Sequence, residues 1–523
     1  MKRSLLVLGS ILVLAVSPIQ AAPTANAALS GTPAQLASGL ATPWEIAPLP
    51  DGRILVTELP GRVRVIENGS LQPTPALNAA FRKLLGLALD PNFSANGYVY
   101  LYIGYGSGCS TDPATTGCKN RIDRYTLGGN SLGSPQTIFD NIPSDGNHDG
   151  GRIKFGPDGK LYVTTGDIHN PALPPDLNSL NGKILRLNAD GSSPSDNPFF
   201  GQAGKRGEVY SYGHRHPQGI AWNGANELYE TEHGPSGEAY AGGQGSRDEI
   251  NKIVPGGNYG WPASRGSVVQ SGTIGPIIYS GDSTTWAPSG AGFGPDGQFY
   301  VPTLSTAAGG HRIRAFTISG STVTGQNEYY VGTYGRLRTT TVHEGNLYFG
   351  TSNGSDQVYR VAFTGAFETY RFWSPRLGNA HFYTQSMAER DNLIQNDNYA
   401  RGGNWIYEGI GFNTLRASGQ TCSSSATAHR FYSPTFRSHF YTSNTAERAQ
   451  LINNDRYGAG GNWVSENVAY CAESGPGTGR LALHRFWSPV YKKHFYTAND
   501  AEKNQLINNN PNWQYENPAH YVY

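Results

Sequence analysis

The sequence predicts an all-β protein of two domains: a six-bladed β-propeller, followed by a smaller β-rich, pseudo-threefold (trefoil-like) repeat domain. Three observations support this prediction. A turn signal followed by a short β-rich run recurs six times in the first two thirds of the chain. An aromatic motif then recurs three times, and long helical periodicity is absent. With 523 residues the chain is also too long for a single hydrophobic core.

The first pattern is a glycine turn before β-branched or aromatic residues, as in Pro50-Asp51-Gly52 before Arg53-Ile54-Leu55-Val56. Asp-Gly and Asn-Gly favour turns that need positive φ, and the residues after them favour strands. The units lie roughly 45–75 residues apart, a spacing typical of propeller blades. A pair of β-sandwiches is the alternative, which this spacing fits less well. We expect the propeller to span residues 33–363. The six runs follow Gly52, Gly97, Gly159, Gly224, Gly297 and Gly345.

The second pattern predicts a repeat domain over residues 367–523. Arg371-Phe372-Trp373-Ser374-Pro375 opens the first repeat, and close variants open the others at 430–434 and 485–489. In each repeat a His-Phe-Tyr-Thr motif follows, then an Ala-Glu and a Leu-Ile pair at helical spacing, and then a tryptophan strand. We therefore expect one short helix per unit. The strand tryptophans are Trp405, Trp463 and Trp513.

The aromatic side chains of the repeats admit two interpretations. A residue that recurs in all three units is what core packing demands, so we favour a packing role. The alternative is that these side chains stack on a polysaccharide or a cell-wall polymer, which would then be a partner of the repeat domain.

The first 27 residues have the features of a secretory signal peptide. Lys2 and Arg3 precede an apolar run from Leu5 to Val16, and Ala25-Asn26-Ala27 fits a cleavage site for small residues. The run is short for a bilayer span, although a single uncleaved anchor is the alternative. No later segment is apolar enough to span. We expect a secreted protein (extracellular or periplasmic), with no membrane span in the mature chain.

Charge and cysteine content limit the kinds of ligand, disulfide and metal site that we expect in this chain. Lys and Arg number 40 and Asp and Glu number 39, so there is no electrostatic basis for binding nucleic acid. Four cysteines allow three pairings, and pairing within each local group is the simplest: Cys109 with Cys118, and Cys422 with Cys471. Export permits these disulfides. Without a Cys-x-x-Cys pair or clustered His, zinc is not expected at the cysteines.

One constellation has the composition of an acid–base site. His148-Asp149-Gly150-Gly151-Arg152 leads into the third hairpin, which ends at Gly166-Asp167. His148 would be a general base, and Asp167 would orient it. The alternative is a turn histidine and a strand-end aspartate without a catalytic role.

Two further motifs would suit an anion. Arg215 and Gln218 stand together at a strand end, and arginine offers a fixed fork of donors to a carboxylate. Arg336 and Arg338 alternate along a strand, so both guanidinium groups can point to one anion. For each motif, a solvated loop or strand end is the alternative.

A hard cation such as calcium would suit the stretch around Glu232-His233-Gly234-Pro235, which is followed by Asp248-Glu249 and by Asn258-Tyr259. Carboxylates and turn carbonyls on irregular backbone are the ligands that calcium prefers. A solvated loop is again the alternative.

The order of these motifs resembles that of the soluble glucose/sorbosone (aldose sugar) dehydrogenases, which use pyrroloquinoline quinone (PQQ). The resemblance runs from about Leu40 to Val361, and the family is a six-bladed propeller, in agreement with the hairpin count. The matching motifs are residues 49–58, Asp90-Pro91-Asn92-Phe93, the His148 block, residues 181–186, the Arg215 block and the block around Trp261.

The resemblance implies a role for each motif. His148 matches the base that takes the sugar hydroxyl proton while hydride passes to the quinone, and Asp167 matches its supporting carboxylate. Calcium would polarise the quinone carbonyl. An external electron acceptor is implied, because no haem-attachment motif is present. The residues matching holders of the tricarboxylate are Arg215, Gln218, Arg336 and Arg338. The calcium positions are Gly234 and Pro235 in one branch of the family, and Glu249 and Tyr259 in another.

Several positions depart from the family pattern. The family usually has Gln before Gly-Leu-Leu where this chain reads Phe81-Arg82-Lys83-Leu84-Leu85. His216 stands in place of an Asn of the family, and Ser305 in place of a lysine that contacts the cofactor in one branch. Thr339 replaces Asp, and the loop from Ser236 to Arg247 is longer than usual. We expect several of these positions to line one cleft. They motivate a second hypothesis, a non-catalytic secreted propeller that binds carbohydrate or cell wall. The repeats resemble an uncharacterised family of extracellular three-repeat modules, from which no activity follows.

Overall fold

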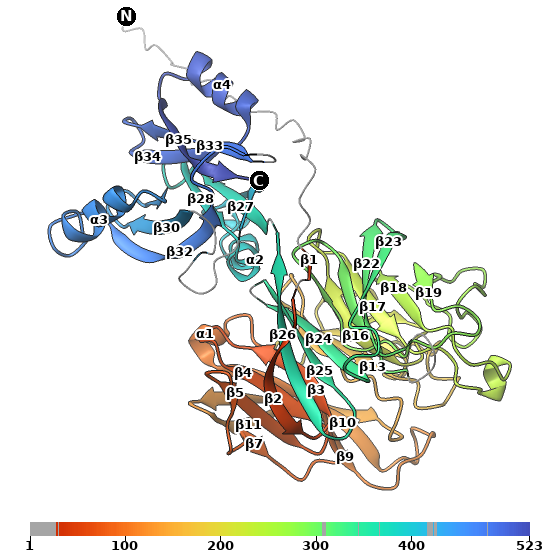
Figure 1. The fold of residues 1–523 in the computed structure, drawn as a ribbon. Coiled ribbons are helices and arrows are strands. Elements are labelled where there is room, and N and C mark those ends of the chain that lie inside the picture. Colours follow the sequence, from red (N-terminus) through yellow and green to blue (C-terminus); the bar gives the residue numbers. More distant parts are fainter. Residues whose placement is uncertain are drawn as a thin grey trace, which may run out of the picture.

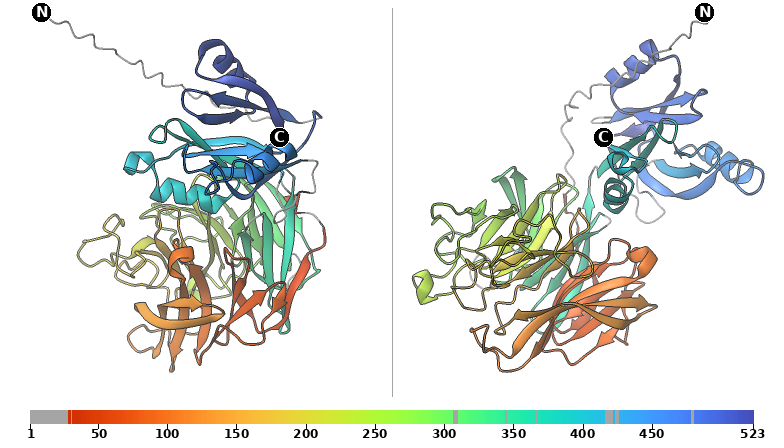
Figure 2. Two further views of the ribbon diagram at one scale, coloured as in Figure 1. Left: turned by 90° about the vertical axis from the view of Figure 1, so that its left-hand side faces the viewer. Right: turned by 180° about the vertical axis from the view of Figure 1, so that it is seen from behind.

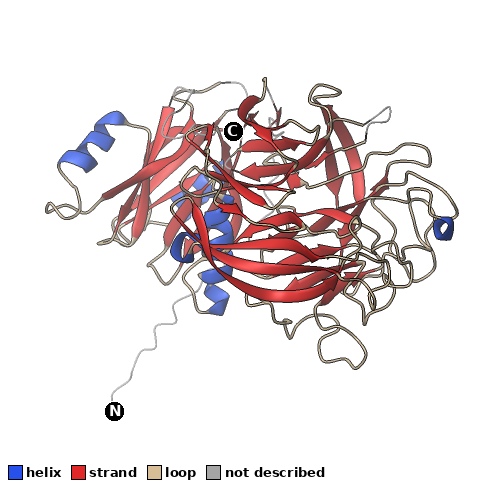
Figure 3. Cartoon of the chain, turned by 90° about the horizontal axis from the view of Figure 1, so that it is seen from below, coloured by secondary structure: helices blue, strands red, loops and turns tan. Residues whose placement is uncertain are grey.

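The computed structural model describes residues 28–29, 31–305, 310–343, 345–365, 367–415, 422, 426–477 and 480–523. Strands dominate and helices are few (Figure 3), which confirms the prediction of an all-β protein. The expected signal peptide, residues 1–27, lies outside the described residues. None of the helices in the described part of the chain is long and apolar enough to cross a bilayer.

Six antiparallel sheets follow one another from Ala34 to Thr364 (Figure 1). The first holds β3 (Pro43–Pro48), β4 (Ile54–Glu58), β5 (Arg62–Glu67), β6 (Ser70–Leu71) and β7 (Leu77–Asn78). The second holds β8 (Lys83–Leu89), β9 (Tyr98–Gly106), β10 (Cys118–Gly128) and β11 (Ser131–Pro143), with the short helix α1 (Phe93–Asn96) before β9. The third holds β12 (Ile153–Phe155), β13 (Leu161–Thr165), β14 (Lys183–Leu187) and β15 (Val209–Tyr212).

The other three sheets have the same antiparallel order. The fourth holds β16 (Pro217–Trp222), β17 (Leu228–Glu232), β18 (Glu249–Ile253) and β19 (Ile278–Tyr279), with a short 3-10 helix at Ala239–Ala241. The fifth holds β20 (Gly292–Phe293), β21 (Phe299–Pro302), β22 (Ile313–Ser319) and β23 (Thr322–Tyr329). The sixth holds β24 (Leu337–His343), β25 (Asn346–Thr351) and β26 (Asp356–Thr364), and both β1 (Ala28–Leu29) and β2 (Ala34–Leu40) pair with β26.

The six sheets form a closed, β-propeller-like ring. The first strand of each sheet contacts the first strand of the next, from β3 through β8, β12, β16 and β20 to β24, and β24 returns to β3. The N-terminal strand β2 completes the sixth sheet, because Ala34 lies opposite Arg360 on β26. Full closure of this kind leaves few exposed sheet edges.

The six sequence turns occupy one structural position. Each joins the first strand of a sheet to the second: Gly52 lies between β3 and β4, and Gly159 between β12 and β13. Gly52, Gly159 and Gly297 have φ of 89°, 72° and 74°, which suits glycine because it has no Cβ. The second strands that follow, such as β4 and β13, are buried along their whole length.

A single arginine joins several sheets at the centre of the ring. The guanidinium carbon of Arg152 lies 3.9 Å from the centroid of the Trp44 ring, and Nε donates to the Gln218 carbonyl at 2.9 Å. Nη1 also pairs with Glu45 and donates to the Trp44 carbonyl at 3.2 Å. Arg152 is fully buried, so these partners compensate the cost of removing its charge from water.

The C-terminal part consists of three sheets of three strands, each with one helix (Figure 2). The first has β27 (Phe367–Ser374) between β28 (Ala380–Thr384) and β29 (Ile406–Thr414), with α2 (Met387–Asn396) and a 3-10 turn at Tyr399–Arg401. The second has β30 (Ala426–Ser433) between β31 (Ser438–Thr442) and β32 (Val464–Ala472), with α3 (Thr445–Asn453). The third has β33 (Leu481–Ser488) between β34 (Lys493–Thr497) and β35 (Gln514–Val522), with α4 (Asp500–Asn509).

Three buried tyrosines connect these sheets in a cycle. The hydroxyl of Tyr383 donates to the Tyr496 carbonyl at 2.7 Å, that of Tyr441 to the Tyr383 carbonyl at 2.8 Å, and that of Tyr496 to the Tyr441 carbonyl at 2.9 Å. Each hydroxyl also accepts a backbone N–H of another of these tyrosines, at 2.9 to 3.0 Å. The cycle gives the repeats a pseudo-threefold arrangement, whereas a trefoil-like fold stays a prediction.

The repeated motifs serve mainly in packing and pairing. Arg371 pairs with Glu502 of α4, and Arg430 pairs with Glu389 of α2, so each arginine binds the helix of another repeat. Trp405 and Trp463 are buried in the apolar clusters of their own repeats. These contacts support the packing interpretation of the aromatic residues.

Both expected disulfides are present. Cys109 is bonded to Cys118, and Cys422 is bonded to Cys471. The first closes a polar loop before β10, and the second links a residue before β30 to β32 of the same repeat.

Candidate functional site

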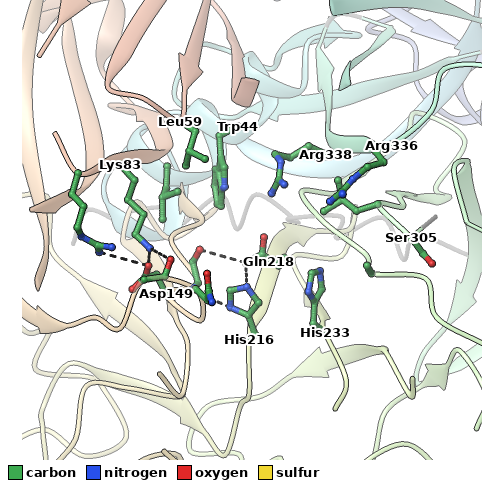
Figure 4. A pocket seen from close by; sticks show the side chains of 17 residues that line it. Trp44, Leu59, Lys83, Asp149, His216, Gln218, His233, Ser305, Arg336 and Arg338 are labelled. Carbon is green, nitrogen blue, oxygen red and sulfur yellow. Dashed lines mark hydrogen bonds and ion pairs between the residues drawn. The ribbon is translucent and has the colours of Figure 1, made fainter. Parts of the chain in front are cut away.

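A cavity of about 630 Å³ lies where the first strands of the sheets meet. Its lining comes mainly from β3, β8, β16 and β24 and from the loops around them. Figure 4 shows Arg336 and Arg338 on one side of the cavity, with Gln218, His216 and His233 facing them. Pockets of this size hold small-molecule ligands and cofactors in many proteins.

The structure brings His148 and Asp167 together. His148 Nδ1 lies 2.7 Å from Asp167 Oδ1, and the indole Nε1 of Trp261 donates to Asp167 Oδ2 at 2.8 Å. Asp167 is fully buried and also accepts the backbone N–H of His169 at 3.0 Å. With Nδ1–H donated to the carboxylate, the lone pair of His148 lies on Nε2, as a general base requires.

Burial and hydrogen bonding act in opposite directions on His148. Burial lowers the pKa of His148 below its usual value, and the hydrogen bond to Asp167 partly opposes this effect. The ring stacks on His216, with centroids 4.8 Å apart, and on His169, with centroids 3.7 Å apart. Burial also holds the pKa of His216 well below its usual value, so both rings are neutral near pH 7.

Arg336 and Arg338 form no ion pair with a carboxylate among the described residues, although the charge of Asp356 acts on Arg338. Burial, and then the charge of Arg336, lower the pKa of Arg338 to about 10. Nε of Arg336 is buried without a hydrogen-bond partner, and Nε of Arg338 reaches only the Ser352 hydroxyl, at 3.4 Å. Two neighbouring, partly buried cations of this kind favour an anionic ligand.

Arg215 lies beside this cavity but is not part of its lining. Its guanidinium pairs with Glu238 of the long loop and donates to the Ser236 hydroxyl at 3.1 Å and to the His233 carbonyl at 3.2 Å. Nε has no partner in the described structure. The long loop therefore supplies the counter-charge of Arg215 from within the chain.

The departures from the family pattern fall in two places. His216 and Ser305 line the cavity, and so do Arg82 and Lys83. Phe81 is not part of the lining, because it packs against an apolar cluster between the first two sheets. The segment from Phe81 to Leu85 therefore lines the cavity through Arg82, Lys83 and Leu85.

Lys83 lines the cavity, where its ammonium group forms an ion pair with a buried carboxylate. It pairs with Asp149, which also accepts the amide of Asn120 at 2.9 Å and the hydroxyl of Ser144. Lys83 Nζ donates to the Gly146 carbonyl at 2.8 Å. The pair fixes the loop that leads to His148.

The expected calcium positions lie on tightly packed backbone next to Arg215. The N–H of Gly234 donates to Asp248 at 2.9 Å, and a Cβ at Gly234 would come within 2.2 Å of the Ser246 carbonyl. Among the described residues, no N–H donates to the carbonyls of Gly234 or Pro235, so both can accept a cation.

Glu249 and Tyr259, the second pair of calcium positions, are also buried in large part. Glu249 accepts the Gly266 N–H at 2.5 Å, and burial raises its pKa to about 8. The hydroxyl of Tyr259 donates to the Lys252 carbonyl at 2.6 Å, which leaves only the backbone of Tyr259 for a cation.

Sequence reasoning missed three contributors to the site. Trp261 lies in one of the motifs shared with the family, but the motif does not show that its indole contacts Asp167, which is 94 residues away in the sequence. His169 follows Asp167 by two positions, where its pairing with Asp145 gives no local pattern. Glu238 lies in a loop that was expected only to be long.

The chain is similar to proteins of known families. Residues 40–360 match the family model for glucose/sorbosone dehydrogenase, and residues 351–407 and 368–523 match a domain of unknown function. The quinoprotein glucose dehydrogenase B of Acinetobacter calcoaceticus is 36% identical over 43% of this chain and 50% of its own length. The aldose sugar dehydrogenase YliI of Escherichia coli is 31% identical over 61% of this chain and 90% of its own length.

Solved structures agree with this match. The PQQ-bound aldose sugar dehydrogenase of Streptomyces coelicolor has a TM-score of 0.55 and 31% identity, over 65% of this chain and 100% of that one. The match covers only 57% and 50% of the first two curated relatives. The family match spans most of the ring of sheets and includes His148, Asp167 and the arginines of the site. The chain belongs to the glucose/sorbosone dehydrogenase family.

Proposed function

We propose that the protein is a secreted quinoprotein oxidoreductase, which oxidises an aldose or a related sugar with PQQ and calcium and uses His148 as the general base. The observation that supports the proposal is the pair of partly buried arginines, Arg336 and Arg338, which form no ion pair within the described structure and line a cavity that adjoins the His148–Asp167 pair. The names of the relatives support the same chemistry.

The residues of the cavity fit PQQ. Arg336 and Arg338 would hold its carboxylates, Gln218 would donate to a polar edge, and Arg215 would contribute from the side. Gly234 and Pro235 would offer carbonyls to calcium, with Glu249 and Tyr259 as the alternative pair. When bound, PQQ accepts two electrons as hydride from the sugar, and calcium makes the quinone more electrophilic.

His148 moves the proton in this scheme. Its neutral Nε2 accepts the proton of the sugar hydroxyl while hydride leaves the carbon that bears this hydroxyl. Asp167 stabilises the imidazolium that forms, and Trp261 holds the carboxylate in place. The low pKa of His148 keeps it neutral, and therefore active, near pH 7.

The six sheets would be the six blades of a propeller over residues 33–363, and residues 367–523 would be a trefoil-like repeat domain. Residues 1–27 would be removed as a signal peptide during export to the periplasm or the exterior. Electrons would pass to an external acceptor, and the repeats would be the part that meets polysaccharide or cell wall.

A titration with PQQ tests the proposal. The absorbance change of PQQ is followed with calcium present, on wild type and on His148→Ala, and dye reduction is then measured with a panel of aldoses. We expect equal PQQ binding and loss of turnover in His148→Ala. Binding of PQQ by neither protein would favour the second hypothesis, a non-catalytic carbohydrate-binding protein, whereas equal turnover would remove His148 from the mechanism.

A further inference from the structure

Two strands of the fourth sheet carry an acidic patch on a face that is otherwise apolar. Strands β17 and β18 pair so that Leu228 lies opposite Ile253, Glu230 opposite Asn251 and Glu232 opposite Glu249. Alternate residues of a strand share a face, so the apolar pair and the polar pairs face the same way. Leu228 and Ile253 pack in the apolar cluster between the third and fourth sheets. The carboxylates therefore point into the space between two sheets and not into solvent.

A histidine from the neighbouring chain segment completes this cluster. His214, Glu230 and Glu232 each offer one ligand atom, and these atoms lie within 4.8 Å of one another. The three residues are 0%, 0% and 5% exposed. His214 Nε2 lies 2.9 Å from the Ser211 hydroxyl, which leaves Nδ1 on the side of the carboxylates, 3.1 Å from Glu232 Oε2. A second partner that holds the other ring nitrogen is typical of histidines that bind metals.

One carboxylate oxygen of the cluster and one neighbouring amide oxygen lack a hydrogen-bond donor. Glu230 Oε1 and Asn251 Oδ1 are buried without a partner, although the Asn251 amide donates to the other oxygen of Glu230 at 3.1 Å. Within the described residues, no lysine or arginine forms an ion pair with Glu230 or Glu232. Buried carboxylate oxygens without a donor or a cation are costly, and a bound cation is one ligand that satisfies them.

We propose that His214, Glu230 and Glu232 form a buried structural site for a divalent cation that accepts imidazole and carboxylate ligands together. Zn²⁺ and Mn²⁺ belong to this class, whereas Ca²⁺ prefers a shell of oxygens alone. The orphaned Oδ1 of Asn251, which lies opposite Glu230, is a further oxygen beside these ligands. The site adjoins the second pair of calcium positions, because Glu249 lies opposite Glu232 and the ring of Tyr259 stacks on His214 with centroids 4.7 Å apart. Its own ligands are other side chains, and it does not depend on the proposed function.

The site has a structural consequence for the cavity. The second oxygen of Glu232 accepts the backbone N–H of Arg215. A cation held by Glu232 and His214 would therefore fix the turn that carries Arg215 and His216 between β15 and β16. Loss of the cation is expected to loosen this turn and to lower the Tm of the protein.

The test uses the full-length protein with Zn²⁺ and, separately, Mn²⁺ as probes. Wild type, Glu230→Gln and Glu227→Gln are stripped with a chelator, incubated with the metal, passed through a desalting column and measured by mass spectrometry for retained metal. Glu227 is the matched control, because it lies just before β17 and pairs with Lys252 at 2.6 Å, away from the cluster. We expect wild type and Glu227→Gln to retain about one equivalent more than Glu230→Gln, as a single site requires.

A second measurement, thermal unfolding with chelator, tests the proposal on wild type even if Glu230→Gln does not fold. Chelator is added to wild type during thermal unfolding, and a fall in Tm is expected that Glu230→Gln does not show. His214→Gln, which removes the nitrogen ligand, is expected to behave as Glu230→Gln does. Equal retention in wild type and Glu230→Gln overturns the proposal. The proposal is also overturned if wild type retains neither metal and its Tm does not respond to chelator. The carboxyl groups of the cluster would then be protonated and would bind no cation.

Discussion

Asp167→Asn isolates the contribution of the carboxylate behind His148. The substitution keeps the size of the side chain and replaces a charged acceptor, which is fully buried and 2.7 Å from Nδ1, with a neutral one. Hydrogen bonds to charged groups contribute about 1.5–3 kcal/mol and neutral ones about 1 kcal/mol. The imidazolium that forms during turnover therefore loses about 1–2 kcal/mol of stabilisation, and kcat falls about 5- to 30-fold.

The pH dependence of this variant has a definite sign. Burial is the larger effect on the pKa of His148 and lowers it, while the hydrogen bond from Asp167 raises it. Asp167→Asn removes the raising contribution, so the pKa of His148 falls further. The active form is neutral His148, and the rate rises as pH rises through this pKa. The acidic limb of the pH–rate profile is therefore expected at lower pH in the variant, while the plateau is lower than in wild type.

The assay is steady-state dye reduction by the protein reconstituted with PQQ and calcium, measured across pH. PQQ binding by absorbance is the control, and it is expected to be unchanged. Trp261→Phe is the matched variant, since it removes only the 2.8 Å hydrogen bond to the other carboxylate oxygen; we expect a loss of about 2- to 10-fold. An unchanged plateau in Asp167→Asn, or an acidic limb that moves to higher pH, would refute the reasoning.

Three other substitutions test the remaining contacts. Arg338→Gln is expected to weaken PQQ binding about 10- to 100-fold in the absorbance titration, because it removes a charged donor, and to raise the Tm of the apo-protein, because it relieves repulsion from Arg336; tighter PQQ binding would contradict this. Glu238→Gln is expected to tighten PQQ binding in the same titration, because Arg215 no longer has an internal counter-ion; weaker binding would show that Glu238 positions Arg215 productively. Tyr496→Phe is expected to cost about 1–3 kcal/mol in urea unfolding, because the Tyr441 carbonyl loses its buried donor; a cost near zero would mean that water replaces the hydroxyl.

Local sequence signals predicted the turns and helices well. Each glycine turn joins the first two strands of a sheet, and five of the six turn glycines have positive φ, a preference of the residue itself that needs no distant partner. At the fourth turn Asn226, and not Gly224, has the positive φ. The three helices begin where Ser386, Asn444 and Asn499 accept backbone N–H groups of the first turn. Capping is also local, so the repeat pattern alone was sufficient to place the helices.

Side-chain direction was harder to predict. Phe81 packs into an apolar cluster, while Arg82 and Lys83, its neighbours, both line the cavity. Strand β8 contains a register shift between Leu84 and Leu87, so simple alternation does not hold at this point. The pairing of Lys83 with Asp149 depends on two sheets meeting, and no pattern within either segment indicates it.

The arginines of the site differ in one respect that decides how they contribute to binding. Arg215 already has a counter-ion, Glu238, so a ligand carboxylate must share Arg215 with Glu238 or displace it. Only the difference in free energy between the two ion pairs then contributes to the affinity for the ligand. Arg336 and Arg338 have no carboxylate partner within the described structure, so the same ligand relieves a charge repulsion that the apo-protein carries. The two arginines on β24 and just before it are therefore expected to supply most of the affinity for an anion, and Arg215 to supply orientation. It follows that substitution of Arg338 affects PQQ affinity more strongly than the same substitution of Arg215.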